Sequence, residues 1–380
     1  LLVSYLGIDE VCKGERVYRL LDCDLTFHRE RPRPGETLRH DIRIDSFARL
    51  GDTTLFYFHY DCTSDGNLVM TMRQGSAGFF TPDELATPHG VDPAPDADVP
   101  RAPAVTPLLP GAPATLDDAA VLALAAGHFS AAFGPTFASA DGARLNLPPH
   151  PDWRLVHRVL DLRLDGDPHG LGRVVFEQDL SDDDWFNPVH FKGDPCMPGT
   201  LMFQGCLQAV QMWLLAAGVA AVVPHGRFEP VTGRPARLRC RGQVVPGHTK
   251  LTYEARIKEA SLDGEPYAIA DVLLRVQGTP VVLAYDVGVR VVGDRIALQP
   301  TAGVPAVDQR LVLEYSIGSA EKAFGPAYAP FDRELRCARM PGPPYLTMTR
   351  VRSVEGAPMV QAAPRTVEIE YDVSPMAWYF

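Results

Sequence analysis

The pattern of apolar and polar residues predicts runs of strands on both sides of one long apolar helix. Residues 18–80 and 237–292 are rich in Val, Leu, Phe, Tyr and Thr and are divided by turn sequences, which predicts strands. Residues 199–218 are almost entirely apolar over a helical length, and a helix that is apolar on all sides has to be buried. A shorter set of strands is expected over residues 346–370.

Two stretches between these runs are predicted to be linkers. Residues 87–116 are rich in Pro and Ala, which is typical of a partly extended connection, and a second linker follows residue 292. Helical spacing predicts a helix over residues 116–133, and strands are expected over residues 153–186.

The order of strands, one buried helix and then antiparallel strands is that of a hotdog, an α+β fold in which an antiparallel sheet wraps around a central helix. We therefore expect tandem hotdog folds in a double-hotdog arrangement. The expected parts are the carboxy-terminal part of a first hotdog, a Pro/Ala-rich linker with a helix, a complete hotdog, a second linker and the amino-terminal part of a further hotdog. They cover residues 1–86, 87–150, 151–293, 294–340 and 341–380 respectively.

Internal repeats support this division. GHFSAAFGPTF at residues 127–137 matches GSAEKAFGPAY at residues 318–328, and FEQDLSDDDWF at residues 176–186 matches IEYDVSPMAWY at residues 369–379. The chain opens within an element, so we expect it to be part of a longer polypeptide.

Composition excludes several classes of protein. The net charge of −11 argues against a nucleic-acid-binding surface, and no apolar run approaches ~20 residues, so no membrane span is expected. The seven cysteines form no Cys-x-x-Cys pair, which predicts reduced thiols in a cytoplasmic protein and no metal site.

The segment WFNPVHFKGDPCMPGTLMFQGCLQ, residues 185–208, carries the candidate chemistry. We expect His190 in a short extended segment, then a turn shaped by Asp194 and Pro195, and then Pro198-Gly199 opening the apolar helix. The first amides of a helix lack partners within it and attract negative charge, and imidazole is the usual proton carrier near neutral pH. We therefore interpret His190 as a catalytic base and the Gly199 amide as an oxyanion donor.

This segment resembles the active-site segment of FabA-type hotdog dehydratases, and the surrounding sequence resembles the multi-hotdog dehydratase regions of polyunsaturated fatty acid synthases and iterative polyketide synthases. The resemblance implies a 3-hydroxyacyl-[acyl-carrier-protein] dehydratase, a lyase that converts (3R)-hydroxyacyl chains to trans-2-enoyl thioesters. The substrate is carried on phosphopantetheine, so no further cofactor is expected. The implied partners are an acyl carrier protein, other synthase domains and a second hotdog, in a pseudo-dimeric or homodimeric pair.

Several residues of the segment are candidates for contact with the acyl chain. The expected substrate-binding residues are Phe191, Pro198, Met202, Phe203 and Gln208. Met197, Met212 and Trp213 either line an acyl tunnel with Met202 and Phe203 or pack in the core. Gln208 either positions the acid or a water molecule, or is a packed and satisfied amide of the buried helix. Cys196 and Cys206 are interpreted as small apolar packing residues.

Gln204 departs from the resemblance, because FabA-type enzymes carry Asp or Glu at this position as the catalytic acid. An amide hydrogen-bonds but does not transfer a proton. Either the site is composite, with the carboxyl supplied by the paired hotdog, or the site has lost its activity and Gln204 marks a silent pseudo-dehydratase that holds acyl chains or acts as a scaffold. A hotdog thioesterase is a third alternative, which Gln204 disfavours because water activation needs a carboxylate.

Overall fold

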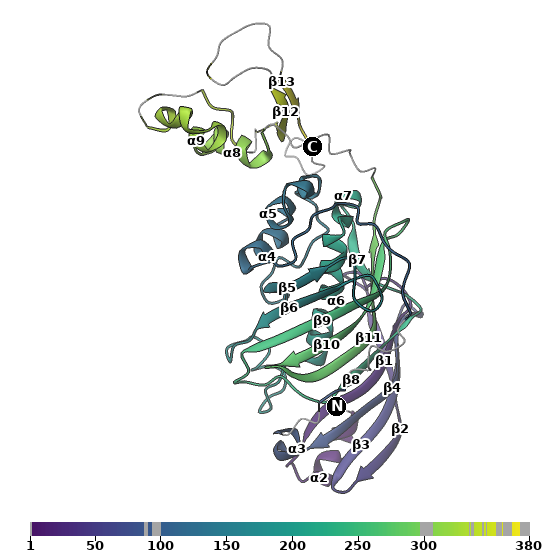
Figure 1. Cartoon of the computed structure of the whole chain (residues 1–380). Helices are drawn as coiled ribbons and strands as arrows, with labels where there is room; N and C mark the ends of the chain where they lie inside the picture. Colours follow the sequence, from purple (N-terminus) through teal and green to yellow (C-terminus); the bar gives the residue numbers. More distant parts are fainter. Residues whose placement is uncertain are drawn as a thin grey trace. The chain divides into compact units, whose positions relative to one another are not determined.

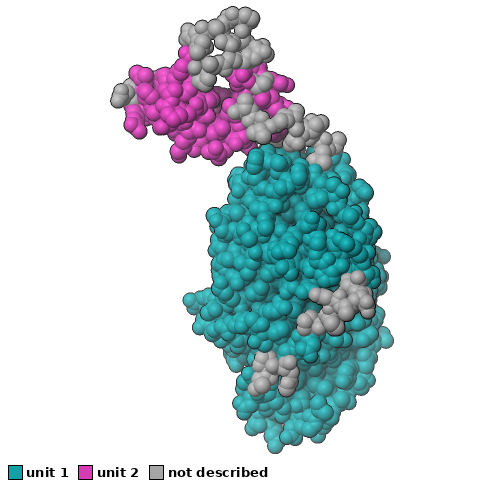
Figure 2. All heavy atoms as spheres, viewed as in Figure 1, with its two compact units in different colours: residues 1–298 teal, residues 299–380 magenta. Residues whose placement is uncertain are grey.

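The computed structural model describes residues 2–86, 90–92, 100–296, 307–333, 335, 338–343, 346, 348–354, 359 and 367–372. These residues divide into two compact units, Leu1–Leu298 and Gln299–Phe380 (Figure 2). Among the described residues, no helix is long and apolar enough to cross a membrane.

One antiparallel sheet dominates the first unit (Figure 1). Its eleven described strands follow the order β2-β3-β4-β1-β8-β11-β10-β9-β6-β5, with β7 paired to β11. The strands are β1 (Val17–Phe27), β2 (Leu38–Leu50), β3 (Thr53–Ser64), β4 (Asn67–Phe80), β5 (Arg158–Arg163), β6 (Arg173–Asp179), β7 (Arg227–Pro230), β8 (Pro235–Cys240), β9 (Lys250–Ser261), β10 (Tyr267–Val276) and β11 (Thr279–Val292).

The central helix α6 (Gly199–Ala216) lies inside the curve of this sheet, against β6, β9, β10 and β11 (Figure 1). It is buried almost throughout, as its apolar sequence predicts, and most of its side chains join the main core. Gly205 lets the helix approach β9 closely, because a Cβ atom there would lie 2.4 Å from the ring of Tyr253. That ring is fully buried and stacks on Phe176 at 4.4 Å. The fold class is therefore confirmed as an α+β hotdog.

Strands β1 to β4, called the first strand set, share one sheet with the strands of the complete hotdog, because β1 pairs antiparallel with β8. Ion pairs reinforce this seam: Asp22 of β1 accepts from Arg241 at 3.0 Å, and Asp24 accepts from Arg237 at 3.1 Å. The predicted double-hotdog arrangement is confirmed, and its sheet is continuous.

The shorter helices of the first unit are α1 (Leu2–Tyr5), α2 (Ile8–Val11), α3 (Pro82–Ala86), α4 (Asp118–Ala125), α5 (Phe129–Phe133), the 3-10 helix η1 (Pro135–Ala140) and α7 (Val219–Val222). The helix predicted over residues 116–133 is thus present as α4 and α5. Leu124, Phe129, Phe133 and Phe137 are buried in the same core as α6. The helix predicted within the Pro/Ala-rich linker of residues 87–150 therefore packs in the globular core. The domain bounds stay a prediction.

The second unit repeats the local structure of residues 116–179. Asp308 caps α8 (Gln309–Ile317) as Asp117 caps α4, each accepting a hydrogen bond from the amide three residues later at 2.8 Å. Gly325 and Gly134 have nearly equal φ angles, 98° and 101°, before a 3-10 helix. The elements of the second unit are α8 (Gln309–Ile317), α9 (Ala320–Phe324), η2 (Pro326–Asp332), β12 (Arg350–Val354) and β13 (Val367–Glu370). The repeated sequence therefore folds twice in the same way.

Candidate active site

His190 lies in a series of tight turns between β6 and α6. Its amide donates to the carbonyl of Phe186 at 2.9 Å, and Phe191 and Asp194 exchange two backbone hydrogen bonds of 3.1 Å. Gly193 has a φ of 78°, which a residue with a side chain adopts at a cost. The expectation of a short extended segment around His190 is therefore wrong: Asn, Pro, Gly and Asp are frequent here, and these residues favour turns over strand pairing.

The hydrogen bonds of the His190 ring assign its tautomer. Nδ1 lies 3.0 Å from the carbonyl oxygen of Cys196, and a carbonyl can only accept, so Nδ1 carries the proton in the neutral ring. The amide of Cys196 in turn donates to the His190 carbonyl at 3.0 Å. The ring also packs on Phe191, with centroids 4.0 Å apart. A neutral imidazole held in this way presents the Nε2 lone pair as a base.

The start of α6 offers free amide donors. Leu201 and Met202 both donate to the carbonyl of Pro198 at 3.0 Å, whereas the amides of Gly199 and Thr200 have no hydrogen-bond partner among the described residues. A Cβ atom built on Gly199 would meet nothing within 4 Å, so there is open space beside this amide. A helix of this length directs positive potential at its first turn. The arrangement can stabilise a developing oxyanion.

The two glutamines of α6 differ in their partners. Gln204 is half-buried, and its amide makes no hydrogen bond within the described part of the chain. Gln208 is completely buried; it donates to the carbonyl of Trp153 at 2.6 Å and accepts from the amide of Leu155 at 2.9 Å. The Gln208 amide is therefore engaged with the backbone, and its expected role at the substrate stays a prediction.

The apolar candidates divide by exposure. Phe191 is 39% exposed, whereas Met202 and Phe203 are 7% and 9% exposed and join the main core. Met197, Met212 and Trp213 are also buried, and Trp213 donates from Nε1 to the carbonyl of Leu171 at 2.9 Å. Contact of these side chains with an acyl chain remains a prediction.

Neither cysteine of the segment is prepared for nucleophilic chemistry. Burial raises the pKa of the Cys196 thiol and, more strongly, that of Cys206, so both thiols stay protonated near neutral pH. No group of three or more His, Cys, Asp or Glu in the described ranges is arranged to hold a metal ion.

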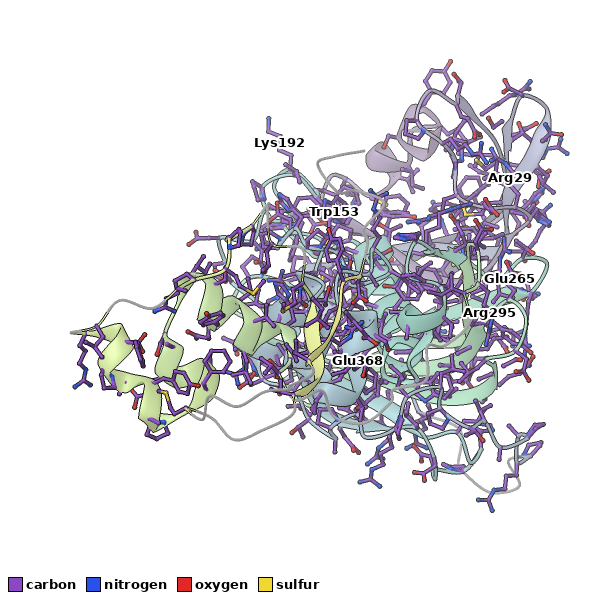
Figure 3. All side chains as sticks on the ribbon, turned by 90° about the horizontal axis from the view of Figure 1, so that it is seen from above. Arg29, Trp153, Lys192, Glu265, Arg295 and Glu368 are labelled. Carbon is purple, nitrogen blue, oxygen red and sulfur yellow. The ribbon has the colours of Figure 1, made fainter. Side chains whose placement is uncertain are left out.

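A residue of the first strand set reaches this site. Arg19 of β1 donates two hydrogen bonds to the Asp194 carboxylate, at 2.6 and 2.7 Å, and the Tyr18 ring meets that of Phe191 edge to face. Sequence reasoning missed Arg19, because nothing local in a strand marks a partner 175 residues away. In contrast, Lys192 extends from the same turn away from the body of the protein (Figure 3).

Comparison with known proteins shows which proteins this chain resembles. Residues 147–285 match the FabA-like domain, so this part of the chain is similar to that domain. The chain is also 38% identical over 292 residues to one of the subunits of a polyunsaturated fatty acid synthase from Thraustochytrium sp.. That match covers 72% of this chain but only 19% of the relative, so the chain spans about a fifth of the relative's length.

Solved structures resemble the chain more distantly. The dehydratase domain of RzxB from Pseudomonas fluorescens is 11% identical with a TM-score of 0.37, over 75% of this chain and 81% of that one. An acyl-CoA thioesterase II, TesB2, from Mycobacterium marinum is 13% identical with a TM-score of 0.36, over 72% and 80%. Sequence identities and TM-scores this low do not distinguish a dehydratase from a thioesterase.

Proposed function

We propose that this chain is a dehydratase region of a fatty acid or polyketide synthase and converts (3R)-hydroxyacyl-[acyl-carrier-protein] to the trans-2-enoyl thioester. The observation that supports it most is the presence of a fixed imidazole and a free helix amide in one short segment. His190 has Nδ1 engaged by Cys196 and Nε2 left as a base, and Gly199 has an unpartnered amide beside open space. The FabA-like match and the synthase to which the 38% identical relative belongs agree with this reaction and setting.

In the proposed reaction, Nε2 of His190 removes the proton from C2 of the thioester. The electrons of that C–H bond move toward the carbonyl, and the Gly199 amide holds the enolate oxygen, an interaction typically worth about 3 kcal/mol of barrier. The C2–C3 double bond then forms as the C3–O bond breaks. The leaving hydroxyl takes a proton from an acid and departs as water.

The acid is the part of the reaction that Gln204 does not supply. We propose a composite site in which the paired hotdog provides a carboxyl group to the His190 side. The shared sheet and the contacts of β1 with the His190 turn support this arrangement, since they bring the first strand set against the turn.

The expected partner is an acyl carrier protein, which delivers the substrate on phosphopantetheine, and the other domains of a synthase. Lys192 is exposed in the turn that follows His190. Carrier proteins are usually acidic, so a lysine beside the site suits their approach.

The alternative that a specific observation favours is a silent pseudo-dehydratase, because Gln204 is an amide without a hydrogen-bond partner in the described part of the chain. His190→Ala separates the two functions, in this chain extended upstream so that the paired hotdog is complete. We expect loss of dehydration of a 3-hydroxyacyl-carrier-protein with unchanged thermal unfolding, measured by product mass. Equal turnover by the variant would remove His190 from the mechanism, and no turnover by the unsubstituted protein would favour the silent form.

A further inference from the structure

Arg19 makes an unusually complete set of hydrogen bonds at the seam between the two hotdogs. Besides the two bonds to Asp194, its Nε donates to Gln243 at 2.8 Å and its Nη1 donates to the carbonyl of Tyr18 at 2.7 Å. The side chains of Arg19 and Asp194 are only 13% and 20% exposed. A contact through two parallel hydrogen bonds fixes the orientation of the guanidinium plane relative to the carboxylate plane, which a single point charge does not.

Asp194 transmits this constraint to the candidate base. Its amide and carbonyl are both bonded to Phe191, the residue after His190, at 3.1 Å. The ring of Phe191 contacts both the His190 ring and the Tyr18 ring, with centroids 4.0 and 6.2 Å apart respectively. Two consecutive residues of β1 thus hold the turn. Arg19 binds Asp194 by charge, and Tyr18 packs against the ring of Phe191.

The other ion pairs of the seam lack this connection. Arg237 with Asp24 and Arg241 with Asp22 also join the first strand set to the complete hotdog. Neither pair contacts the turn of residues 186–197 through any bond that the structure shows. Stabilising the shared sheet therefore does not by itself require a bond to Asp194.

We propose that Arg19 is a positioning residue: from the first hotdog it fixes the turn that carries His190 in the second, so that the site is assembled only when the two halves are joined. The kinetic consequence rests on the proposed dehydration, but the structural consequence does not. Removal of Arg19 leaves the Asp194 carboxylate half-buried without its cation, and the turn loosens around His190.

The first test measures backbone hydrogen exchange in the 380-residue chain. Arg19→Ala is expected to speed exchange of the amides of residues 191–196 by roughly tenfold or more, with little change in β9 and β10. The matched control is Arg237→Ala, which removes an ion pair from the same seam and is expected to leave exchange of the turn unchanged. Arg19→Lys keeps the charge but loses the two parallel hydrogen bonds to Asp194. We expect its turn amides to exchange at a rate between those of Arg19→Ala and the unsubstituted chain.

The second test measures dehydration of a 3-hydroxyacyl-carrier-protein by the same variants in the upstream-extended chain. Arg19→Ala should lower kcat by about 10²-fold with a much smaller change in KM, because misplacing a catalytic group by about 1 Å costs that much. The double variant Arg19→Ala/Asp194→Asn should be no slower than the slower single variant, since the two residues act through one contact.

These measurements keep the two proposals apart. Faster exchange of the turn in Arg19→Ala supports the positioning role even if the unsubstituted, upstream-extended chain shows no dehydration, a result that would overturn only the proposed function. Unchanged exchange and unchanged kcat in Arg19→Ala would overturn the positioning role. Equal effects of Arg19→Ala and Arg237→Ala across the whole sheet would also overturn it, because Arg19 would then be an ordinary seam residue.

Discussion

Arg158 of β5 binds the carboxylate of Asp179 at the end of β6 through two hydrogen bonds, from Nη1 to Oδ1 at 2.8 Å and from Nη2 to Oδ2. The second unit repeats this contact: Arg350 of β12 donates to Asp372, just after β13, at 2.5 Å. In both units the same arginine also bonds a glutamate two residues before the aspartate. The sequence repeat is thus a repeat of side-chain contacts, and residues at equivalent positions can be compared directly.

Equivalent apolar residues have opposite exposures in the two units. Phe176 of β6 is fully buried, whereas Ile369, its equivalent in β13, is 51% exposed. In the first unit, α6 packs against β6, and Tyr253 of the neighbouring strand β9 stacks on Phe176. We predict that Phe176→Ala lowers the free energy of unfolding of the first unit by about 3–5 kcal/mol. Ile369→Ala should change that of the second unit by less than about 1 kcal/mol. Urea denaturation measures both, and equal losses would show that the Ile369 face is covered in solution.

Two glycines of α6 provide a matched pair for packing. Gly205→Ala places a methyl group against the Tyr253 ring, and overpacking of this kind typically costs about 1–3 kcal/mol. Gly199→Ala places a methyl group in open space at the first helical position, so we expect the thermal midpoint to stay within about 2 °C. Calorimetry of both variants tests whether α6 lies as close to β9 as the structure has it. A Gly205→Ala protein of full stability would contradict that packing.

Two aspartates at equivalent positions are predicted to titrate in opposite directions. Asp141 accepts from the amide of Ser130 at 2.8 Å, and burial raises its pKa. Asp332 accepts from the Ser319 hydroxyl at 2.6 Å and from two backbone amides, and these hydrogen bonds lower its pKa well below the usual range. Carboxyl carbon NMR titration should place the Asp141 midpoint above, and the Asp332 midpoint below, the ordinary value of about 3.9.

The sign of the stability effect follows from these directions. Because the folded pKa of Asp332 is depressed, its contribution to stability is complete above about pH 4 and is lost as the pH falls through the folded pKa. Asp332→Asn should therefore destabilise the second unit at neutral pH, and the difference from the unsubstituted protein should shrink in acid. For Asp141 the folded pKa is raised, so protonation on acidification adds stability. An Asp332→Asn effect that is constant from pH 7 to pH 2 would contradict the assignment.

The buried helix and the strands of the sheet were predictable, because each depends on a pattern that is local in sequence. A fully apolar run has to be buried wherever it folds, and strand patterns with turn residues between them are typical of antiparallel sheets. Of the candidate site, His190 and Gly199 were recognised because they lie in one short segment whose order of turn and helix start is visible in the sequence.

What the sequence did not reveal depends on contacts between distant residues. Arg19 and Asp194 meet only because β1 pairs with β8, and no local pattern encodes that partnership. The backbone partners of Gln208 are likewise more than 50 residues away. The extended conformation expected around His190 was wrong because Asn187, Pro188 and Gly193 favour turns.

Lys192 tests the expected approach of an acidic carrier protein. Its ammonium group is exposed beside the site, so Lys192→Glu replaces an attraction by a repulsion without disturbing the core. We predict a several-fold rise in KM for the carrier-bound substrate, larger at low salt, with kcat unchanged. Steady-state kinetics at two ionic strengths, with a substrate on free pantetheine as the control, measures this. An equal rise in KM for the free pantetheine substrate would indicate a role in the site itself.

Gln204→Glu distinguishes a composite site from a site that has lost its activity. In a composite site the acid comes from the paired hotdog and Gln204 lies outside the reacting pair, so restoring a carboxyl group should change the rate of dehydration little. In a decayed site the new carboxyl would supply the missing acid, and general acid catalysis is typically worth roughly 10²–10⁴-fold. We expect the first outcome in the upstream-extended chain, and we expect the 380-residue chain to be inactive without the paired hotdog's acid. Gln204→Asn serves as the control for side-chain volume, since it shortens the side chain without adding an acid. A large gain from Gln204→Glu alone, or robust dehydration by the 380 residues as they stand, would overturn the composite site.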